Sequence, residues 1–275
     1  MFNKGYYMKL NKILLGIIST LCMCFTIFPT TSCGREKYTK GLEFTLWPEE
    51  NEYYVTGYKG TDTDVIIPSI YKNKPVTGIC DIFGGGDIIL KFGNVFKDCD
   101  FITSISIPDS VTYICNNAFE GCSSLKSVMF GNGLTSISHG MFEGCNSLEN
   151  IAIPNSVTSI GAFAFSECSS LKTVTIPDSV TYIEFAAFDG CSSLESVTIP
   201  NNVTYIGSFA FDDCSSLKSI IISDSVTKID YSAFSKCTSL KIVNYTGTEE
   251  QWSSIEIREN NDYLKNANII YNYKG

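Results

Sequence analysis

The chain has 275 residues, of which 44% are hydrophobic, and its 20 Lys and Arg against 29 Asp and Glu give a formal charge of −9. This size and apolar content suffice for a large domain with a real core, whereas the acidic balance argues against nucleic acid or an anionic membrane face as a partner. A single histidine, His139, makes a histidine-based metal site or catalytic triad hard to build.

Residues 1–32 are predicted to be a lipoprotein signal peptide. Lys9 and Lys12 precede an uncharged apolar run of 16 residues at 13–28, which is shorter than the ~20 residues of a membrane-spanning helix. The run leads to TTSC, where Cys33 is expected to be lipidated and to become the mature N-terminus. An ordinary cleaved signal with a chance cysteine is the alternative, and Met8 is an alternative translation start.

Residues 33–60 are expected to form an N-terminal cap, because an open end of a repeat array exposes core and strand edges. Within this cap, apolar and polar residues alternate over the segment 38–60, a pattern that predicts a β-hairpin. Residues 61–98 are interpreted as a degenerate first repeat with an insertion. The insertion, Asp81–Gly93, contains three consecutive glycines that indicate a bend, and we interpret it as a tolerated surface feature.

Residues 99–246 contain a 23-residue repeat with a cysteine at the same place in each copy. Each copy has a short alternating strand such as SVTIP, which usually ends at a proline, and a turn such as PDSV follows. VTYI is a second short extended piece, and xxAFxxC is expected to be a tight 3₁₀ turn. One copy cannot bury its apolar side chains alone, so stacked copies are predicted to form a solenoid. The repeated cysteines are Cys99, Cys122, Cys145, Cys168, Cys191, Cys214 and Cys237.

Residues 247–275 are predicted to be the C-terminal cap. Thr248 and Gln251 have the spacing of a capping box and indicate a short helix. Trp252 and Ile255 on that helix are expected to face the last coil, and the segment 267–273 is expected to close the array as a strand.

The repeat C-x-S-L-x-S-V-x-I-P-x-S-V-T-x-I-x-x-x-A-F resembles the BspA-like class of leucine-rich repeat over about residues 61–246. The resemblance implies a β-dominated α/β leucine-rich-repeat solenoid, a right-handed curved superhelix of 23-residue strand–turn–strand–3₁₀ repeats with caps at both ends. It also implies a bacterial cell-surface protein of the adhesin or binding type, and no catalytic residue belongs to the motif.

Four interpretations of the repeated cysteines compete. A zinc site needs Cys-x₂-Cys pairs or nearby histidines, and a catalytic thiol needs a base and a histidine partner. Disulfides are compatible with a repeat spacing of about 5 Å, but parallel side chains and an odd number of cysteines disfavour them. We favour a structural ladder of buried thiols, each a weak S–H donor to a neighbouring turn. No metal and no cofactor is therefore expected.

Outward-facing positions of the repeat provide the candidate binding surface. The outward residues of the longer strands should share one sheet face, which the resemblance implies is the concave one. Their side chains are small and uncharged, whereas the tyrosines lie on another face. The acids that recur before the cysteines (Glu120, Glu143, Glu167, Asp189, Asp212, Asp213) and His139 are expected to be solvated, with weak cation binding as a minor alternative for the acids. The candidate binding residues are Ser106, Met129, Thr175, Thr198 and Ile221 on the sheet face, and Tyr113, Tyr182 and Tyr205 on the other.

The sequence thus predicts an exported protein, lipid-anchored at the bacterial cell surface or outer membrane, that touches the membrane only through its lipid. Its predicted function is adhesin-like binding of an extracellular-matrix or host surface protein through the solenoid, without catalysis. The alternatives are a structural surface scaffold and a capture protein for a glycan or peptide. A binding surface usually contains an aromatic or arginine cluster, and the predicted strand face contains none.

Overall fold

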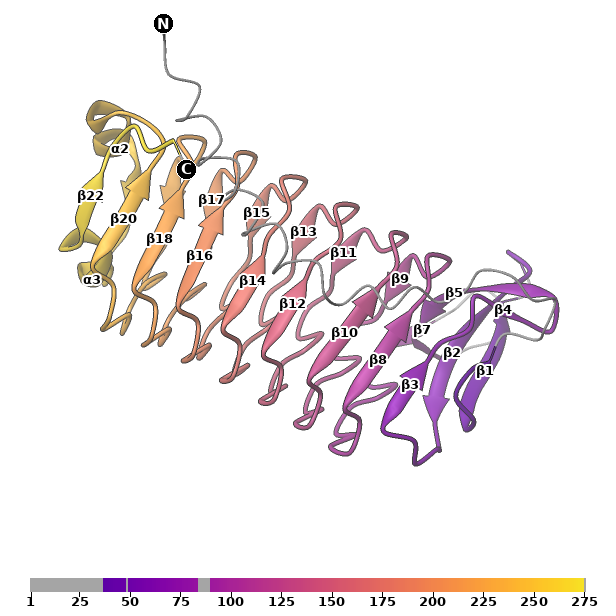
Figure 1. The fold of residues 1–275 in the computed structure, drawn as a ribbon. Coiled ribbons are helices and arrows are strands. Elements are labelled where there is room, and N and C mark those ends of the chain that lie inside the picture. Colours follow the sequence, from indigo (N-terminus) through magenta and orange to yellow (C-terminus); the bar gives the residue numbers. More distant parts are fainter. Residues whose placement is uncertain (1–36, 48, 84–89, 275) are drawn as a thin grey trace, which may run out of the picture. The chain divides into compact units, whose positions relative to one another are not determined.

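The computed structural model describes residues 37–47, 49–83 and 90–274. These residues form a solenoid whose coils stack one on the next (Figure 1). Each coil has three sides, which we call the long-strand face, the short-strand face and the turn face. The solenoid and the leucine-rich-repeat architecture predicted from the sequence are confirmed.

The long-strand face is built from one strand per coil, each parallel to the next where they pair. Successive strands pair residues that are 23 positions apart, as Val197 with Ile220 and Ile220 with Val243. Because side chains alternate along a strand, Val197 enters the core while Thr198 points outward. The strands are β3 (Asp64–Ile66), β8 (Ser104–Ile107), β10 (Ser127–Phe130), β12 (Asn150–Ala152), β14 (Thr173–Thr175), β16 (Ser196–Ile199), β18 (Ser219–Ile222), β20 (Ile242–Tyr245) and β22 (Asn268–Ile270).

The short-strand face contains two-residue strands that follow the turn after each long strand. An outward residue precedes a buried isoleucine in each repeat strand, as in Tyr205–Ile206. The strands are β9 (Tyr113–Ile114), β11 (Ser136–Ile137), β13 (Ser159–Ile160), β15 (Tyr182–Ile183), β17 (Tyr205–Ile206), β19 (Lys228–Ile229) and, in the C-terminal cap, β21 (Glu256–Ile257).

The turn face connects each short strand to the following ladder cysteine, and here the expected 3₁₀ turn is replaced by a run of other turns. Two residues in each coil have a positive φ, such as Asn117 (58°) and Gly121 (73°) before Cys122. A left-handed residue breaks the helical path of the chain. Alternate N–H groups therefore bond to the next coil, as Phe119 does to the carbonyl oxygen of Met141 at 3.0 Å, while those between them bond three residues back, as Glu120 does to Asn117.

The core is a stack of identical side chains from successive coils. Neighbouring rings have centroids 5.2–5.5 Å apart and interplanar angles of 5–13°, an offset stack that buries every ring. The isoleucine of each short strand and the leucine after each repeat cysteine pack around this stack. The stacked rings belong to Phe96, Phe119, Phe142, Phe165, Phe188, Phe211 and Phe234.

The N-terminal cap is the expected hairpin, made of antiparallel β1 (Leu42–Trp47) and β2 (Glu52–Tyr58). It continues the short-strand side, because β2 pairs in parallel with β5 (Lys74–Ile79) of the first coil. The short strand β4 (Ile70–Tyr71) folds back on β5. Paired strands thus cover the end of the solenoid, as a repeat array requires.

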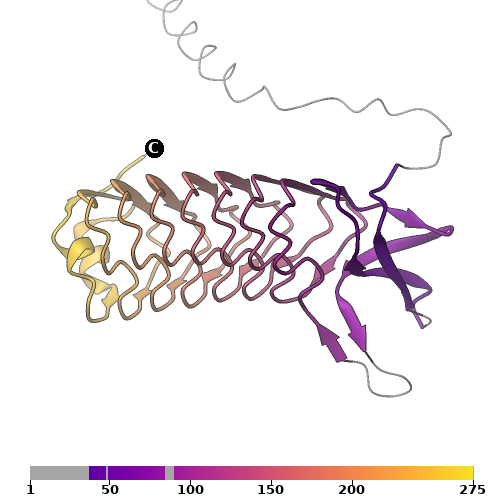
Figure 2. The same cartoon turned by 90° about the horizontal axis from the view of Figure 1, so that it is seen from below.

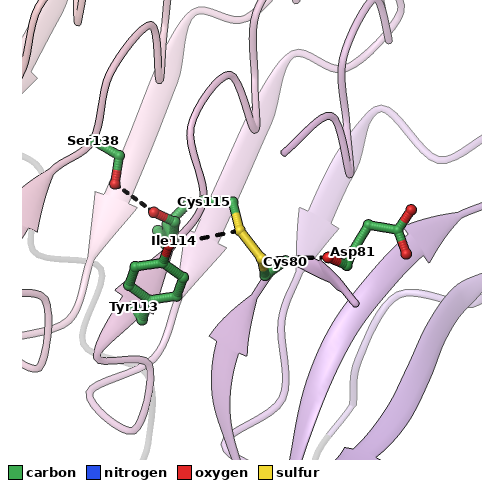
Figure 3. The surroundings of a disulfide bond; sticks show 6 residues. All are labelled: Cys80, Asp81, Tyr113, Ile114, Cys115 and Ser138. Atoms are coloured by element: carbon green, nitrogen blue, oxygen red, sulfur yellow. Dashed lines mark hydrogen bonds between the residues drawn. A yellow bond between two sulfur atoms is a disulfide. The ribbon is translucent and has the colours of Figure 1, made fainter. Parts of the chain in front are cut away.

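The insertion forms a second hairpin, β6 (Asp81–Phe83) with β7 (Leu90–Phe92), which stands out from the side of the solenoid (Figure 2). Its residues 84–89 lie outside the described residues. A disulfide joins Cys80, at the base of this hairpin, to Cys115 in the next coil (Figure 3). The hydroxyl of Tyr113 lies 3.9 Å from the sulfur of Cys115, and the hydroxyl is the donor because a disulfide sulfur has no proton.

The C-terminal cap begins with helix α2 (Glu249–Ser254), where Thr248 and Gln251 form the expected capping box. Trp252 is buried and meets Tyr245 of the last coil edge-on, with ring centroids 5.1 Å apart. Helix α3 (Asp262–Lys265) follows, and β22 then extends the long-strand face. Within the described part of the chain, no helix has the length and apolar character needed to cross a bilayer.

Candidate binding surfaces

The repeat cysteines belong to the core and not to a reactive site. All seven are free thiols, and each except Cys99 is buried. From the second to the seventh, each sulfur donates to the carbonyl oxygen of the phenylalanine 26 residues earlier, as Cys168 to Phe142 at 3.2 Å. Burial raises their pKa values, to about 12 for Cys237, so the nucleophilic thiolate is suppressed. In the described chain, no group of three His, Cys, Asp or Glu side chains is placed to hold a metal ion.

The sheet-face candidates line up on the long-strand face. Met129 lies beside Ser106, and Thr198 lies beside Ile221, in the registers of the paired strands. Met129 is 55% exposed, and the other large apolar side chains exposed on this face are Ile66, Ile242 and Ile270 near its two ends. The other members are small or half-buried, so this face is flat and weakly featured over most of its length.

One hollow interrupts the long-strand face near the C-terminal cap. It has a volume of about 460 Å³ and is lined by Thr175, Thr198 and Ile221 together with Asp178, Tyr273 and Lys274. The C-terminal tail forms one wall, because Tyr273 donates its N–H to the carbonyl oxygen of Tyr245 at 3.0 Å. Three residues singled out from the sequence therefore meet a tyrosine that the repeat pattern did not indicate.

The tyrosine candidates are only partly brought together on the short-strand face. Tyr182 and Tyr205 are register neighbours, whereas Tyr113 is separated from them by coils that carry serine at this position. Tyr182 is 40% exposed. Burial and a 2.7 Å hydrogen bond to Asp230 raise the pKa of Tyr205 to about 12, so its hydroxyl is occupied within the protein.

A row of exposed rings that the sequence analysis missed crosses the turn face beside these tyrosines. We call it the ring row: His139, Phe163, Phe185, Phe209 and Tyr231. The first four rings meet edge-on in sequence, with centroids 5.4, 5.2 and 5.5 Å apart. Phe185 is 42% exposed, Tyr231 is 44% exposed, and His139 is exposed as expected.

The ring row is built from two alternating positions of the repeat. His139, Phe185 and Tyr231 stand six residues before a ladder cysteine, whereas Phe163 and Phe209 stand five before one. The spacing therefore alternates between 24 and 22 residues, which hides the row from a search at a period of 23. A pairwise comparison of alternate copies would have found it.

Two of these rings require a strained backbone. Phe163 (φ 57°) and Phe209 (φ 59°) lie in the left-handed region, which costs a residue with a Cβ roughly 1–2 kcal/mol. Both rings remain half-exposed, so core burial does not fully offset this cost. The same position is left-handed in the other coils, as at Asn117, Ala186 and Ser232, so the strain comes from the repeated turn and the two rings accept it.

The recurring acids lie beside the ring row, and the expectation that all are solvated is wrong for one of them. Asp212 is buried and pairs with Lys236 at 3.1 Å, because its carboxylate turns toward the next coil. Glu120 is half-buried and pairs with Lys97 at 2.9 Å. The others define what we call the acid row, and none of them forms an ion pair with a described residue: Glu143, Glu167, Asp189 and Asp213.

The acid row is electrostatically crowded around Asp189. Partial burial, and then the charges of Asp212 and Glu167, raise the pKa of Asp189 to about 6. The charge of Lys236 lowers this pKa, and the charge of Asp213 raises it further. The turn face is thus an aromatic strip bordered by carboxylates.

Stacked coils with two strand rows and a buried leucine, isoleucine and phenylalanine core define a leucine-rich-repeat protein. The chain belongs to the BspA type leucine rich repeat family, whose model matches residues 93–188 and 160–270 with six copies of the repeat. This is a family of repeat scaffolds rather than enzymes, in agreement with the absence of catalysis predicted from the sequence.

A solved structure shows the same fold. The leucine-rich repeat protein TpLRR from T. pallidum is 28% identical, with a TM-score of 0.54 over 77% of this chain and 86% of that one. A leucine-rich repeat protein from Bacteroides ovatus is 24% identical, with a TM-score of 0.49 over 86% of this chain and 71% of that one. No curated protein shows significant sequence similarity.

Proposed function

We propose that the protein is an exported, adhesin-like surface protein that binds an extracellular-matrix or host surface protein without turning it over. The observation that carries this proposal is the ring row. Exposed aromatic side chains in mutual contact are the residues that most often dominate the energy of a protein interface. The ring row replaces the long-strand face as the preferred contact, because four of its rings meet edge-on in sequence.

The proposed location rests on the N-terminal segment, which lies outside the described residues. The apolar run before TTSC supports export, and Cys33 supplies the thiol for lipid attachment at the bacterial surface or outer membrane. Cys33→Ser should release the protein from the membrane fraction into the soluble fraction. Unchanged partition between the two fractions would contradict the lipid anchor.

The binding proposal is tested with immobilised extracellular-matrix and host-cell surface proteins and the full chain. The double variant Phe185→Ala/Phe209→Ala should lower retention by about tenfold or more, the effect of removing interface hot spots. Met129→Ala is the matched control, because it removes a 55% exposed apolar side chain from the other face. Equal retention of the double variant and the wild type would refute the role of the ring row.

Capture of a glycan or peptide is the second candidate function, and the hollow on the long-strand face favours it. Tyr273 offers a ring, while Thr175, Thr198 and Asp178 offer hydroxyl and carboxylate groups around about 460 Å³. Tyr273→Ala and Thr198→Lys should then abolish retention of a saccharide or peptide while Phe185→Ala has no effect. A structural scaffold role predicts no specific retention at either surface.

A further inference from the structure

The ring row and the acid row lie next to each other on the turn face. Gly140 follows His139 and holds in its coil the position that Phe163 and Phe209 hold in theirs, and a Cβ on it would stand 3.2 Å from a carboxylate oxygen of Glu143. In the preceding coil, Asn117 occupies the same position and donates to the carboxylate of Glu120 at 2.6 Å. A ligand whose apolar side chain packs on the rings would therefore lie close to a carboxylate of the same coil.

The carboxylates of this strip lack cationic partners, so they favour a cationic ligand. The four members of the acid row form no ion pair with a described residue. Two neighbouring acids do: Glu120 pairs with Lys97, and Asp212 pairs with Lys236. The acid row thus repeats the carboxylates of the paired positions but has no lysine paired with them.

The C-terminal end of the ring row shows how such a cation binds. The guanidinium of Arg258 lies 5.4 Å from the centroid of the Tyr231 ring and pairs with Glu256. Arginine stacks on aromatic rings and pairs with carboxylates at the same time, which suits a strip with rings on one side and acids on the other. The chain itself thus places a guanidinium over one ring of the row, paired there with a carboxylate of β21 on the short-strand face.

Building on the proposed function, we propose that the partner contributes a segment in which arginine or lysine side chains alternate with apolar ones. The apolar side chains pack on Phe163, Phe185 and Phe209, and the cations pair with the acid row. The ring row spans four intervals between coils, about 20 Å at the usual strand spacing of ~4.8 Å, so roughly six to eight extended residues cover it.

The pH dependence follows from the crowding at Asp189. The charged groups that face this carboxyl are Asp212, Glu167, Lys236 and Asp213, and its pKa is about 6. A bound cation favours the ionised carboxylate of Asp189 over the protonated carboxyl. Molecules in which Asp189 is protonated therefore release this proton when the cation binds. Affinity should therefore rise as the pH increases from about 5 to about 7.5.

The probes are three fluorescein-labelled peptides of about ten residues, enough to span the row. The first alternates arginine and leucine, the second glutamate and leucine, and the third arginine and serine. Their binding to the purified full chain is followed by fluorescence anisotropy at two pH values. Only the first peptide should bind tightly, and more tightly at the higher pH.

Substitutions locate the site. Phe185→Ala and Asp189→Asn should each weaken the first peptide by about tenfold, and Asp189→Asn should also remove most of the pH dependence. Asp100→Asn and Ile66→Ala are the matched controls and should change nothing, because they remove an exposed carboxylate and a 42% exposed apolar side chain outside the ring row, the acid row and the hollow. Circular dichroism and a thermal melt check that each variant remains folded.

Three outcomes would overturn the inference: equal binding of the glutamate peptide, equal binding of the arginine–serine peptide, or insensitivity to Phe185→Ala and Asp189→Asn. Its failure is distinct from failure of the proposed function. If matrix-protein retention depends on Phe185 while the arginine–leucine peptide does not bind, the partner chemistry is wrong and the binding surface stands. If retention depends on neither, both proposals fail.

Discussion

The thiol of Cys168 donates to the carbonyl oxygen of Phe142 across 3.2 Å, in the interior of the solenoid and one coil apart. The same bond recurs at 3.0–3.3 Å along the buried part of the ladder. Each buried cysteine of the ladder thus adds a second hydrogen bond to a repeated carbonyl of the preceding coil, as at Phe142, which also accepts from the N–H of Cys145 at 3.1 Å. This pairing gives the cysteine at the same place in each coil a structural role.

Burial of the ladder should protect its thiols. Because burial raises their pKa values, the thiols stay protonated even at pH 9, and alkylation of the folded protein should leave Cys145, Cys168 and Cys191 unmodified. Mass spectrometry of proteolytic peptides measures this. Unfolding without reductant should expose all of them to alkylation, whereas Cys80 and Cys115 should react only after reduction. Rapid alkylation of the ladder in the folded state would contradict its structural role.

The disulfide should stabilise the N-terminal end of the solenoid alone. Cys80 and Cys115 are 35 residues apart, and closing a loop of this length stabilises by about 2–4 kcal/mol. Repeats contact only their neighbours, so Cys115→Ser should speed hydrogen exchange in β2 and β5 and leave β15 and β17 unchanged. Uniform loss of protection along the chain would show that the solenoid unfolds as one unit.

Backbone strain at Phe209 should be measurable as a difference between two truncations. Both Phe209→Ala and Phe209→Gly remove the ring, but only alanine keeps the Cβ that disfavours the observed φ of 59°. The glycine variant should therefore be more stable than the alanine variant by about 1 kcal/mol in urea unfolding. At Phe188, which is buried and has no positive φ, the order should reverse. A less stable glycine variant at position 209 would refute the strain.

The crowded carboxyl of Asp189 should make folding stability depend on pH. Its pKa is about 6 in the folded protein, above the ~3.9 of an unfolded aspartate, so the folded state binds more protons between these values. The contribution of Asp189 to the free energy of unfolding is therefore fully present below about pH 4, and it is lost as the pH rises to about 6. Asp189→Asn should flatten the profile of unfolding free energy over this range. An unchanged profile would show that the acid row is fully solvated.

The period of 23 residues was enough to predict the coils, the inward positions and the cap helix at Thr248, because each depends on local pattern. The disulfide was missed because the insertion moves Cys80 to 35 residues from Cys115, although both follow an isoleucine at the same place in their coils. The ring row was missed because its rings alternate between two positions. The burial of Asp212 depends on Lys236 in the next coil, which no pattern within one repeat contains.

The central claim, that a partner protein docks on the ring row, is tested most directly by site-specific photo-crosslinking. Benzoylphenylalanine placed at position 185 stands on the ring row, and at position 129 it stands on the long-strand face at a similarly exposed site. With a matrix protein retained by the wild-type chain, the account predicts a crosslink from position 185 and none from position 129. A crosslink from position 129 with none from position 185 would contradict it.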